Sequence, residues 1–131
     1  MSSTSVVIVE PHLLIRAGFS LILDAPTDLD VVGQGENIDE LIQLVGDTHP
    51  DVVCVSAKFT DGSTIVDALE RLARVEEREP TVLMLTGKRD EEVVDIATQR
   101  GVAAAISKFA TPEDIVEAVR GAVQGPVTAH P

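Results

Sequence analysis

Apolar and polar positions follow two rhythms along this chain, and together they predict strands and helices in alternation. Short continuous apolar runs bounded by proline, glycine or polar residues are typical of strands buried on both faces of a parallel sheet. Such runs occupy residues 6–9, 29–33, 51–56, 81–86 and 102–107. Between them apolar residues recur at helical spacing, which predicts helices over 13–23, 37–45 and 65–75, from 89 or 90 to Gly101, and from Pro112 to about Gln124.

Local residues support several of these helix boundaries. Asn37 followed three positions later by Glu40 is a pattern that opens helices, and Gly46 is expected to help close the same helix. Thr111 is placed to cap the last helix, with Pro112 at its first position, where a backbone N–H is not needed. These signals sharpen the alternating pattern without changing it.

Alternation of strands and helices at this spacing implies a parallel sheet covered by helices on both faces. With 131 residues the chain is long enough for one domain with a proper core, so the sequence predicts a single doubly wound α/β domain over residues 1–124. Residues 125–131 are expected to be a tail or the start of a linker. Aromatic residues make up only 2%, so the core is expected to be aliphatic.

The charge balance excludes some partners. A formal net charge of −12 argues against direct binding of nucleic acid, whose phosphates would repel this segment. The single cysteine, Cys54, lies in an apolar run and is expected to be a core residue. There is no signal-peptide pattern and no apolar run near the roughly 20 residues that span a bilayer, so we expect a cytoplasmic domain without membrane contact.

Polar side chains stand at four of the predicted strand ends. In open parallel sheets, sites form beyond the carboxyl ends of the strands, and Glu10, Ser56, Thr86 and Lys108 follow or end the first, third, fourth and fifth strands. We therefore expect these four side chains to converge. A nucleotide-dependent enzyme is not favoured, because the Gly33-Gln34-Gly35 run follows the wrong strand and lacks the rest of the dinucleotide fingerprint.

The chain resembles the receiver domain of response regulators, the CheY-like phosphoacceptor module, and within it the NarL/FixJ type. The resemblance covers about residues 5–124 and implies a five-stranded sheet in the order 2-1-3-4-5. The segments that carry it are Val7-Ile8-Val9-Glu10-Pro11-His12, Arg16-Ala17-Gly18, Val31-Val32-Gly33, Pro50-Asp51-Val52-Val53 and Thr111-Pro112-Glu113-Asp114-Ile115.

The phosphorylation pocket of that family is only partly matched. In the family an acidic pair follows the first strand, a phosphoacceptor Asp ends the third, a Thr or Ser ends the fourth, and a Lys ends the fifth. Thr86 and Lys108 match, and Glu10 matches the first acid of the pair. Pro11, expected in the first turn of the following helix, replaces the second acid, and Ser56 replaces the phosphoacceptor.

These departures change the expected chemistry. The family reaction needs a carboxylate nucleophile and Mg²⁺ held by carboxylates. Ser56 offers only a hydroxyl, and Glu10 alone would hold Mg²⁺ weakly at most, so no metal or other cofactor is expected. The switch aromatic of the family is replaced by Ala105. His12 is expected to be a surface group at the start of the first helix.

The resemblance implies an atypical receiver that is not an enzyme but a phosphorylation-independent interaction or dimerisation module of a two-component transcription regulator. Its partners would be a second copy of itself, an attached or separate output domain such as a LuxR-type helix-turn-helix, or both. Two alternatives stay open. The emptied pocket could bind a small molecule or anion near Ser56, Thr86 and Lys108, or phosphorylation could persist on Asp61, Glu10 or Ser56.

Overall fold

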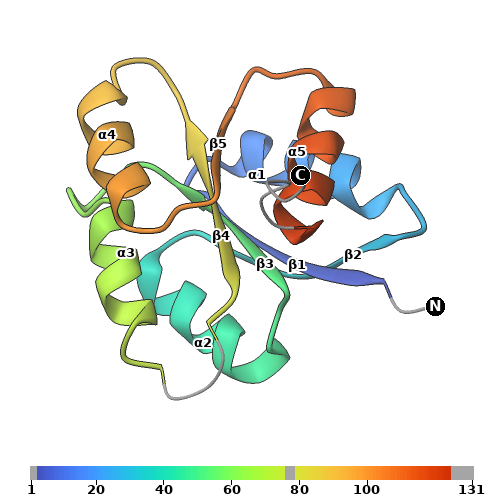
Figure 1. Ribbon diagram of the computed structural model, residues 1–131, viewed down its shortest axis with the longest axis horizontal. Coiled ribbons are helices and arrows are strands. Elements are labelled where there is room, and N and C mark those ends of the chain that lie inside the picture. Colours follow the sequence, from blue (N-terminus) through green and yellow to red (C-terminus); the bar gives the residue numbers. More distant parts are fainter. Residues whose placement is uncertain (1–2, 76–78, 125–131) are drawn as a thin grey trace, which may run out of the picture.

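In the computed structural model, which describes residues 3–75 and 79–124, strands and helices alternate along the chain (Figure 1). The strands are β1 (Thr4–Val9), β2 (Leu29–Gly35), β3 (Val52–Ser56), β4 (Thr81–Thr86) and β5 (Ala104–Ser107). The helices are α1 (Leu13–Asp24), α2 (Ile38–Thr48), α3 (Ile65–Leu72), α4 (Glu91–Gln99) and α5 (Pro112–Gln124). Residues 125–131, expected to be a tail or linker, lie outside the described part of the chain.

The strands form one parallel sheet in the order β2-β1-β3-β4-β5. Helices α1 and α5 pack on one face and α2, α3 and α4 on the other, as Figure 1 shows. The sequence prediction of a doubly wound α/β domain with this strand order is therefore confirmed. The carboxyl ends of all strands point to the same edge of the sheet, which is the edge that carries Glu10, Ser56, Thr86 and Lys108.

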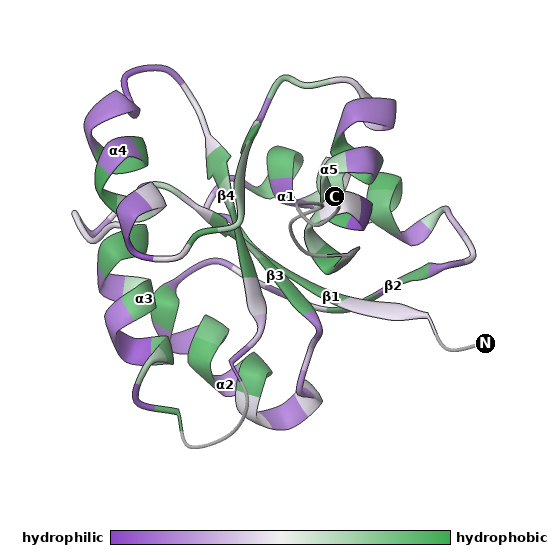
Figure 2. Cartoon of the chain, viewed as in Figure 1, coloured by the Kyte–Doolittle hydropathy of each residue, from purple (hydrophilic) through white to green (hydrophobic). Residues whose placement is uncertain are grey.

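The core consists of two aliphatic layers, one on each face of the sheet. The two central strands, β1 and β3, are buried along nearly their whole length, and Figure 2 shows the central strands as largely hydrophobic. Cys54 belongs to the layer beneath α1 and α5, where burial raises the pKa of its thiol to about 12. It packs as a small apolar residue, as expected.

Helix α2 does not end at Gly46, as the sequence predicted, but continues to Thr48. Its buried face includes Leu41 and Val45, and this packing outweighs the weak helical preference of one glycine. The backbone N–H of the C-cap residue His49 donates to the carbonyl of Val45 as the last helical hydrogen bond, and the left-handed conformation of His49 (φ 47°) then turns the chain out of the helix.

Two further boundaries differ from prediction for reasons of hydrogen bonding and packing. Strand β5 begins at Ala104 instead of residue 102, because the N–H of Val102 donates to the end of α4, at Ala97. Strand β2 extends through Gly35. A Cβ at Gly33 would lie 2.6 Å from Leu44 Cδ2, so this glycine allows α2 to approach β2 closely and serves packing.

The opposite edge of the sheet holds Asp51, which directly precedes β3 instead of opening it. Its carboxylate accepts hydrogen bonds from the backbone N–H and hydroxyl of Ser5, at 2.9 and 3.1 Å.

Among the helices of the described residues, none is long and apolar enough to cross a membrane.

Candidate functional site

Glu10 follows β1 and is fully buried at the carboxyl edge of the sheet. Its backbone is fixed on both sides: its N–H donates to Gly35, and its carbonyl accepts from the Arg16 guanidinium at 2.8 Å. The carboxylate oxygen Oε2 accepts the backbone N–H of His12 at 2.8 Å and lies 3.0 Å from His12 Nδ1. The His12 side chain is mostly exposed, as expected. Its contact with the buried Glu10 carboxylate was not predicted from the sequence.

Lys108 reaches across from the end of β5 to the ends of β1 and β3. Its ammonium Nζ lies 2.8 Å from Glu10 Oε1 and donates to Ser56 Oγ at 3.0 Å. Ser56 is fully buried, and its hydroxyl donates to the carbonyl of Lys58 at 2.9 Å. We call Glu10, Ser56 and Lys108 the buried cluster, because these three side chains contact one another through the single lysine.

The ion pair with Lys108 is the main compensation for burying Glu10. Oε1 accepts no hydrogen bond of good geometry among the described residues, so the nearby ammonium is what offsets its loss of water. Burial raises the pKa of Glu10, but the adjacent Lys108 ammonium and the contacts with His12 outweigh burial and hold the pKa below its ordinary value. The cluster therefore combines one cation with one anion.

Thr86, Pro11 and Ala105 lie at this edge without joining the cluster. The Thr86 hydroxyl turns toward the carbonyl of Ile106, at 3.4 Å, instead of toward Ser56 or Lys108. Pro11 precedes the N-cap residue His12, so the prediction that Pro11 lies in the first helical turn is wrong, because the helix begins two residues later. Ala105 is exposed on β5 and offers no aromatic ring.

A second polar contact joins the loops that follow β3 and β4. Lys58 Nζ donates to the carbonyl of Arg89 at 2.8 Å and lies 3.4 Å from Asp90 Oδ1. Asp90 is buried, and its other oxygen accepts the N–H of Gly87 at 2.6 Å. We call this the cross-loop contact. The sequence analysis placed Asp90 at a helix start, which is where it lies, but missed its pairing with Lys58.

The donor set does not fit the Mg²⁺ that the receiver fold implies. Mg²⁺ prefers several oxygen ligands, usually including carboxylates. Here the only acid of the buried cluster is Glu10, one oxygen of which faces an ammonium while the other accepts from His12. Pro11 and Ser56 add no carboxylate. Across the described residues, no three His, Cys, Asp or Glu side chains gather to hold a metal ion.

Asp61, the other acid considered as a phosphoacceptor, lies exposed in the loop after β3. Its Oδ1 accepts from both the backbone N–H and the hydroxyl of Ser63, and these hydrogen bonds hold the pKa of Asp61 below its ordinary value. The Asp61 carboxylate thus stabilises the turn of the loop in which it lies.

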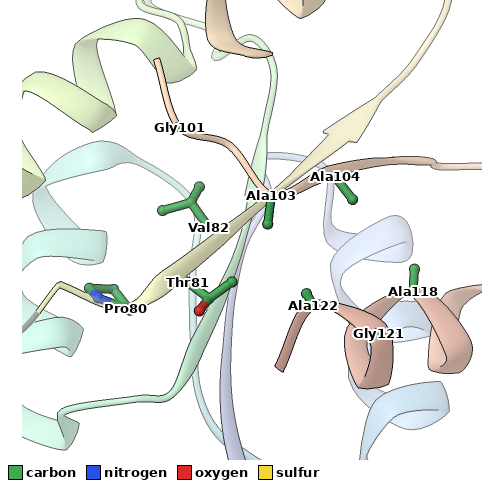
Figure 3. Close-up of a pocket in the computed structure, with 9 residues that line it drawn as sticks. All are labelled: Pro80, Thr81, Val82, Gly101, Ala103, Ala104, Ala118, Gly121 and Ala122. Atoms are coloured by element: carbon green, nitrogen blue, oxygen red, sulfur yellow. The ribbon is translucent and has the colours of Figure 1, made fainter. Parts of the chain in front are cut away.

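A hollow of about 580 Å³ lies at the opposite, amino edge of the sheet, between β4, β5 and α5 (Figure 3). Its walls are mostly small side chains, among them Ala103, Ala104, Ala118 and Ala122. Because it borders the first residues of β4, it lies away from the buried cluster. It is therefore separate from the space in which a ligand near Lys108 would sit.

Comparison with known proteins agrees with this architecture. Residues 6–120 match the response regulator receiver domain family. The chain is 31% identical over 117 residues to the response regulator protein VraR of Staphylococcus saprophyticus, covering 88% of this chain and 54% of that protein. It is 25% identical to the transcriptional regulatory protein LiaR of Bacillus subtilis, covering 92% and 56%.

Among solved structures, the signal receiver domain of NarL from Mycobacterium tuberculosis matches with a TM-score of 0.86 at 24% identity, covering 96% of this chain and 100% of that domain. The doubly wound fold, with the family match, defines a receiver-type signalling domain. The chain belongs to the response regulator receiver domain family, and the NarL/FixJ-type expectation agrees with its relatives. It spans about half the length of the curated relatives it matches.

Proposed function

We propose that this receiver domain acts without aspartyl phosphorylation, as a protein-interaction module of a response regulator. The observation that carries the proposal is the position of Lys108, whose ammonium bridges Glu10 and Ser56. In this arrangement the lysine is already engaged by the chain's own groups, and the position of the nucleophile holds a buried hydroxyl.

Ser56 has no means of activation in this environment. A serine hydroxyl becomes a nucleophile when a neighbouring base takes its proton. The Ser56 hydroxyl donates instead to the carbonyl of Lys58, which is not a base. Its other neighbour is the Lys108 ammonium, which donates to Ser56 Oγ and pairs with Glu10, so it cannot take the proton. The same closed contacts favour the interaction module over an anion-binding pocket, because an anion would have to displace Glu10 from Lys108.

The partners follow from the family and from the length of the relatives. Because the match to this chain covers only about half the length of its relatives, we propose that the receiver serves an output domain, of LuxR helix-turn-helix type, in the same or another chain. A second copy of the receiver is the other proposed partner. The net charge of −12 assigns any DNA contact to the output domain.

The test is incubation with acetyl phosphate and Mg²⁺, followed by intact mass measurement. We expect no phosphoryl gain on the parent chain. An acid-stable gain on Ser56, or a hydroxylamine-labile gain on Asp61 or Glu10, would contradict the proposal. As a matched control, the variant Ser56→Asp/Pro11→Asp restores two carboxylates beside Glu10, and we expect it to bind Mg²⁺ measurably more tightly than the parent by calorimetry.

A further inference from the structure

We propose that the segment that follows α5, Gly125 to Pro131, folds back into the hollow at the amino edge of the sheet and fixes the path of the chain as it leaves the receiver. The hollow lies between the end of α5, the start of β4 and the residues that lead into β5 (Figure 3). This inference goes beyond the proposed function, because it does not depend on whether the domain is phosphorylated. It assigns the receiver a second surface, away from the buried cluster.

The hollow forms because the inner face of α5 carries small residues toward its end. Ile115 and Val119 fill the space above the sheet and are 1% and 0% exposed. In the following turn, Gly121 and Ala122 line the hollow, and neither has a side chain long enough to reach the strands. A Cβ added at Gly121 would meet no described atom within 4 Å beyond its own helix backbone and chain neighbours, so this wall faces open space.

The facing wall also lacks large side chains. Gly101, Ala103 and Ala104 line the hollow on the β5 side, and Pro80 and Val82 line it at the start of β4. None of the described residues that line it carries a charge. Because protein interiors are normally close-packed, an apolar hollow of about 580 Å³ leaves surface in water that a further apolar segment would stabilise by covering it.

The segment after α5 has a composition that suits this hollow. It reads Gly-Pro-Val-Thr-Ala-His-Pro and contains no Asp, Glu, Lys or Arg, although these residues make up 24% of the chain. Gly125 followed by Pro126 is a pattern that ends a helix and redirects the chain. Val127 and Ala129 then supply apolar side chains that are small enough for walls of alanine and glycine.

The short path along the chain favours this segment over other occupants. An extended chain covers roughly 3.3–3.6 Å per residue, so the three residues from Gln124 to Val127 span about 10 Å, enough to return to the last turn of α5. A tethered segment has an effective concentration in the millimolar range. A second copy would instead lose the freedom of a whole molecule on binding and would bring a further net charge of −12.

The first test observes the contact in the full chain. With the methyl groups of alanine and valine labelled, NMR is expected to show nuclear Overhauser effects between the Val127 methyls and those of Ala103 or Ala122. Their intensity per molecule should not change with protein concentration. Lack of these cross-peaks, or cross-peaks that form only between two differently labelled copies, would overturn the proposal.

Xenon tests whether the hollow is filled. Xenon binds in empty apolar cavities, so it should shift the methyl signals of Ala103 and Ala122 only slightly in the parent. Val127→Asp places a carboxylate against an apolar wall, which displaces the segment and should increase these shifts at least about three-fold. Val123→Asp is the matched control, because it adds the same charge four residues earlier, at a position 43% exposed that does not line the hollow. Equal xenon shifts in the parent and in Val127→Asp would show a hollow open to small apolar ligands and contradict the proposal.

Gly121→Leu tests the contact from the wall of the hollow. Gly46→Leu is its control, because Gly46 is also a helical glycine beside which an added Cβ has open space, and it lies outside the hollow. We expect the Val127 cross-peaks to disappear in Gly121→Leu and to persist in Gly46→Leu. Val127→Asp should lower the urea midpoint of the parent but not that of Gly121→Leu.

Additive effects of Gly121→Leu and Val127→Asp would show that the two positions do not share a site, and the proposal would fall. Circular dichroism establishes that the variants are folded, and if Gly121→Leu is not, the xenon comparison of Val127→Asp with Val123→Asp decides. The acetyl phosphate measurement has a separate readout, so the proposed function stands or falls independently of these results.

Discussion

The two polar groupings at the carboxyl edge of the sheet differ in burial and in what they connect. The buried cluster joins the ends of β1, β3 and β5 through a lysine that is only 11% exposed and an acid that is fully buried. The cross-loop contact joins two loops through Lys58, whose side chain is 50% exposed. In the first grouping both charged side chains are shielded from water, whereas the second pairs a buried Asp90 with a half-exposed lysine.

This difference indicates which of the two groupings contributes to the free energy of unfolding of the domain. Charges removed from water depend on their partners, so the buried cluster is expected to matter for global stability. An ion pair in contact with solvent contributes little to the free energy of unfolding, so the cross-loop contact is expected to affect only its own loops. The predictions below separate these two roles, beginning with the largest effect.

Lys108→Met is expected to cause the largest loss of stability. The substitution removes the cation and leaves Glu10 buried with an Oε1 that no other group compensates. Removing one partner of a buried ion pair costs about 3–5 kcal/mol. Urea unfolding of the parent and the variant measures the loss.

The matched control is the double variant Glu10→Gln/Lys108→Met. Because it removes both charges, it is expected to be more stable than Lys108→Met alone, although it changes two residues of the buried cluster instead of one. If the double variant is the less stable of the two, the cost does not come from the unpaired carboxylate, and the buried cluster does not behave as an ion pair.

The pH dependence of stability is expected to report on the acid of the same ion pair, Glu10. The pKa of Glu10 is raised by burial but lowered more by Lys108 and His12, so the folded value lies below the ordinary 4.5. Its contribution to the free energy of unfolding is therefore complete above about pH 4.5 and is lost as the pH falls through the folded pKa.

Glu10→Gln isolates this contribution. Asp28 and Asp61 also have lowered pKa values, from Arg120 and Ser63, and both remain in the variant. Unfolding measured at several pH values from about 7 to about 3 should therefore give a shallower loss of stability in Glu10→Gln than in the parent. Parallel curves would show that Glu10 has the same pKa in the folded and unfolded chains.

Much of the buried cluster could be predicted from the sequence because topology dictates it. Once the alternating pattern implies a parallel sheet, residues at the carboxyl ends of β1, β3 and β5 must lie at one edge, whatever their side chains do. Glu10, Ser56 and Lys108 meet for this reason. The sheet order itself came from the family resemblance and was confirmed by the structure.

The remaining features depend on side-chain directions that a linear pattern does not encode. Thr86 stands at the expected strand end, but its hydroxyl turns to a backbone carbonyl of β5. Lys58 and Asp90 are 32 residues apart in two loops, and no spacing rule links them. Helix α2 runs past its predicted end because Gly46 only weakly favours a stop, whereas the buried face of the helix stabilises it to Thr48.

The smallest global effect is expected for Lys58→Met, with a local effect that distinguishes it from Lys108→Met. The substitution removes the contacts of Nζ with Arg89 and Asp90. Since the lysine is half exposed and the buried Asp90 carboxylate keeps its hydrogen bond from Gly87, the loss of stability should be at most about 1 kcal/mol. Hydrogen exchange should nevertheless accelerate in the loop from Gly87 to the start of α4, because Lys58 no longer anchors the Arg89 carbonyl.

Lys88→Met is the matched control, because it removes a neighbouring lysine that takes no part in the cross-loop contact. Its hydrogen exchange in the β4–α4 loop should remain that of the parent. Asp90 should keep its hydrogen bond from Gly87 in Lys58→Met, so exchange at Gly87 is expected to rise less than at the residues that follow. If Lys58→Met instead destabilises the whole domain as strongly as Lys108→Met, the surface contact supports the core, and the division between the two groupings is wrong.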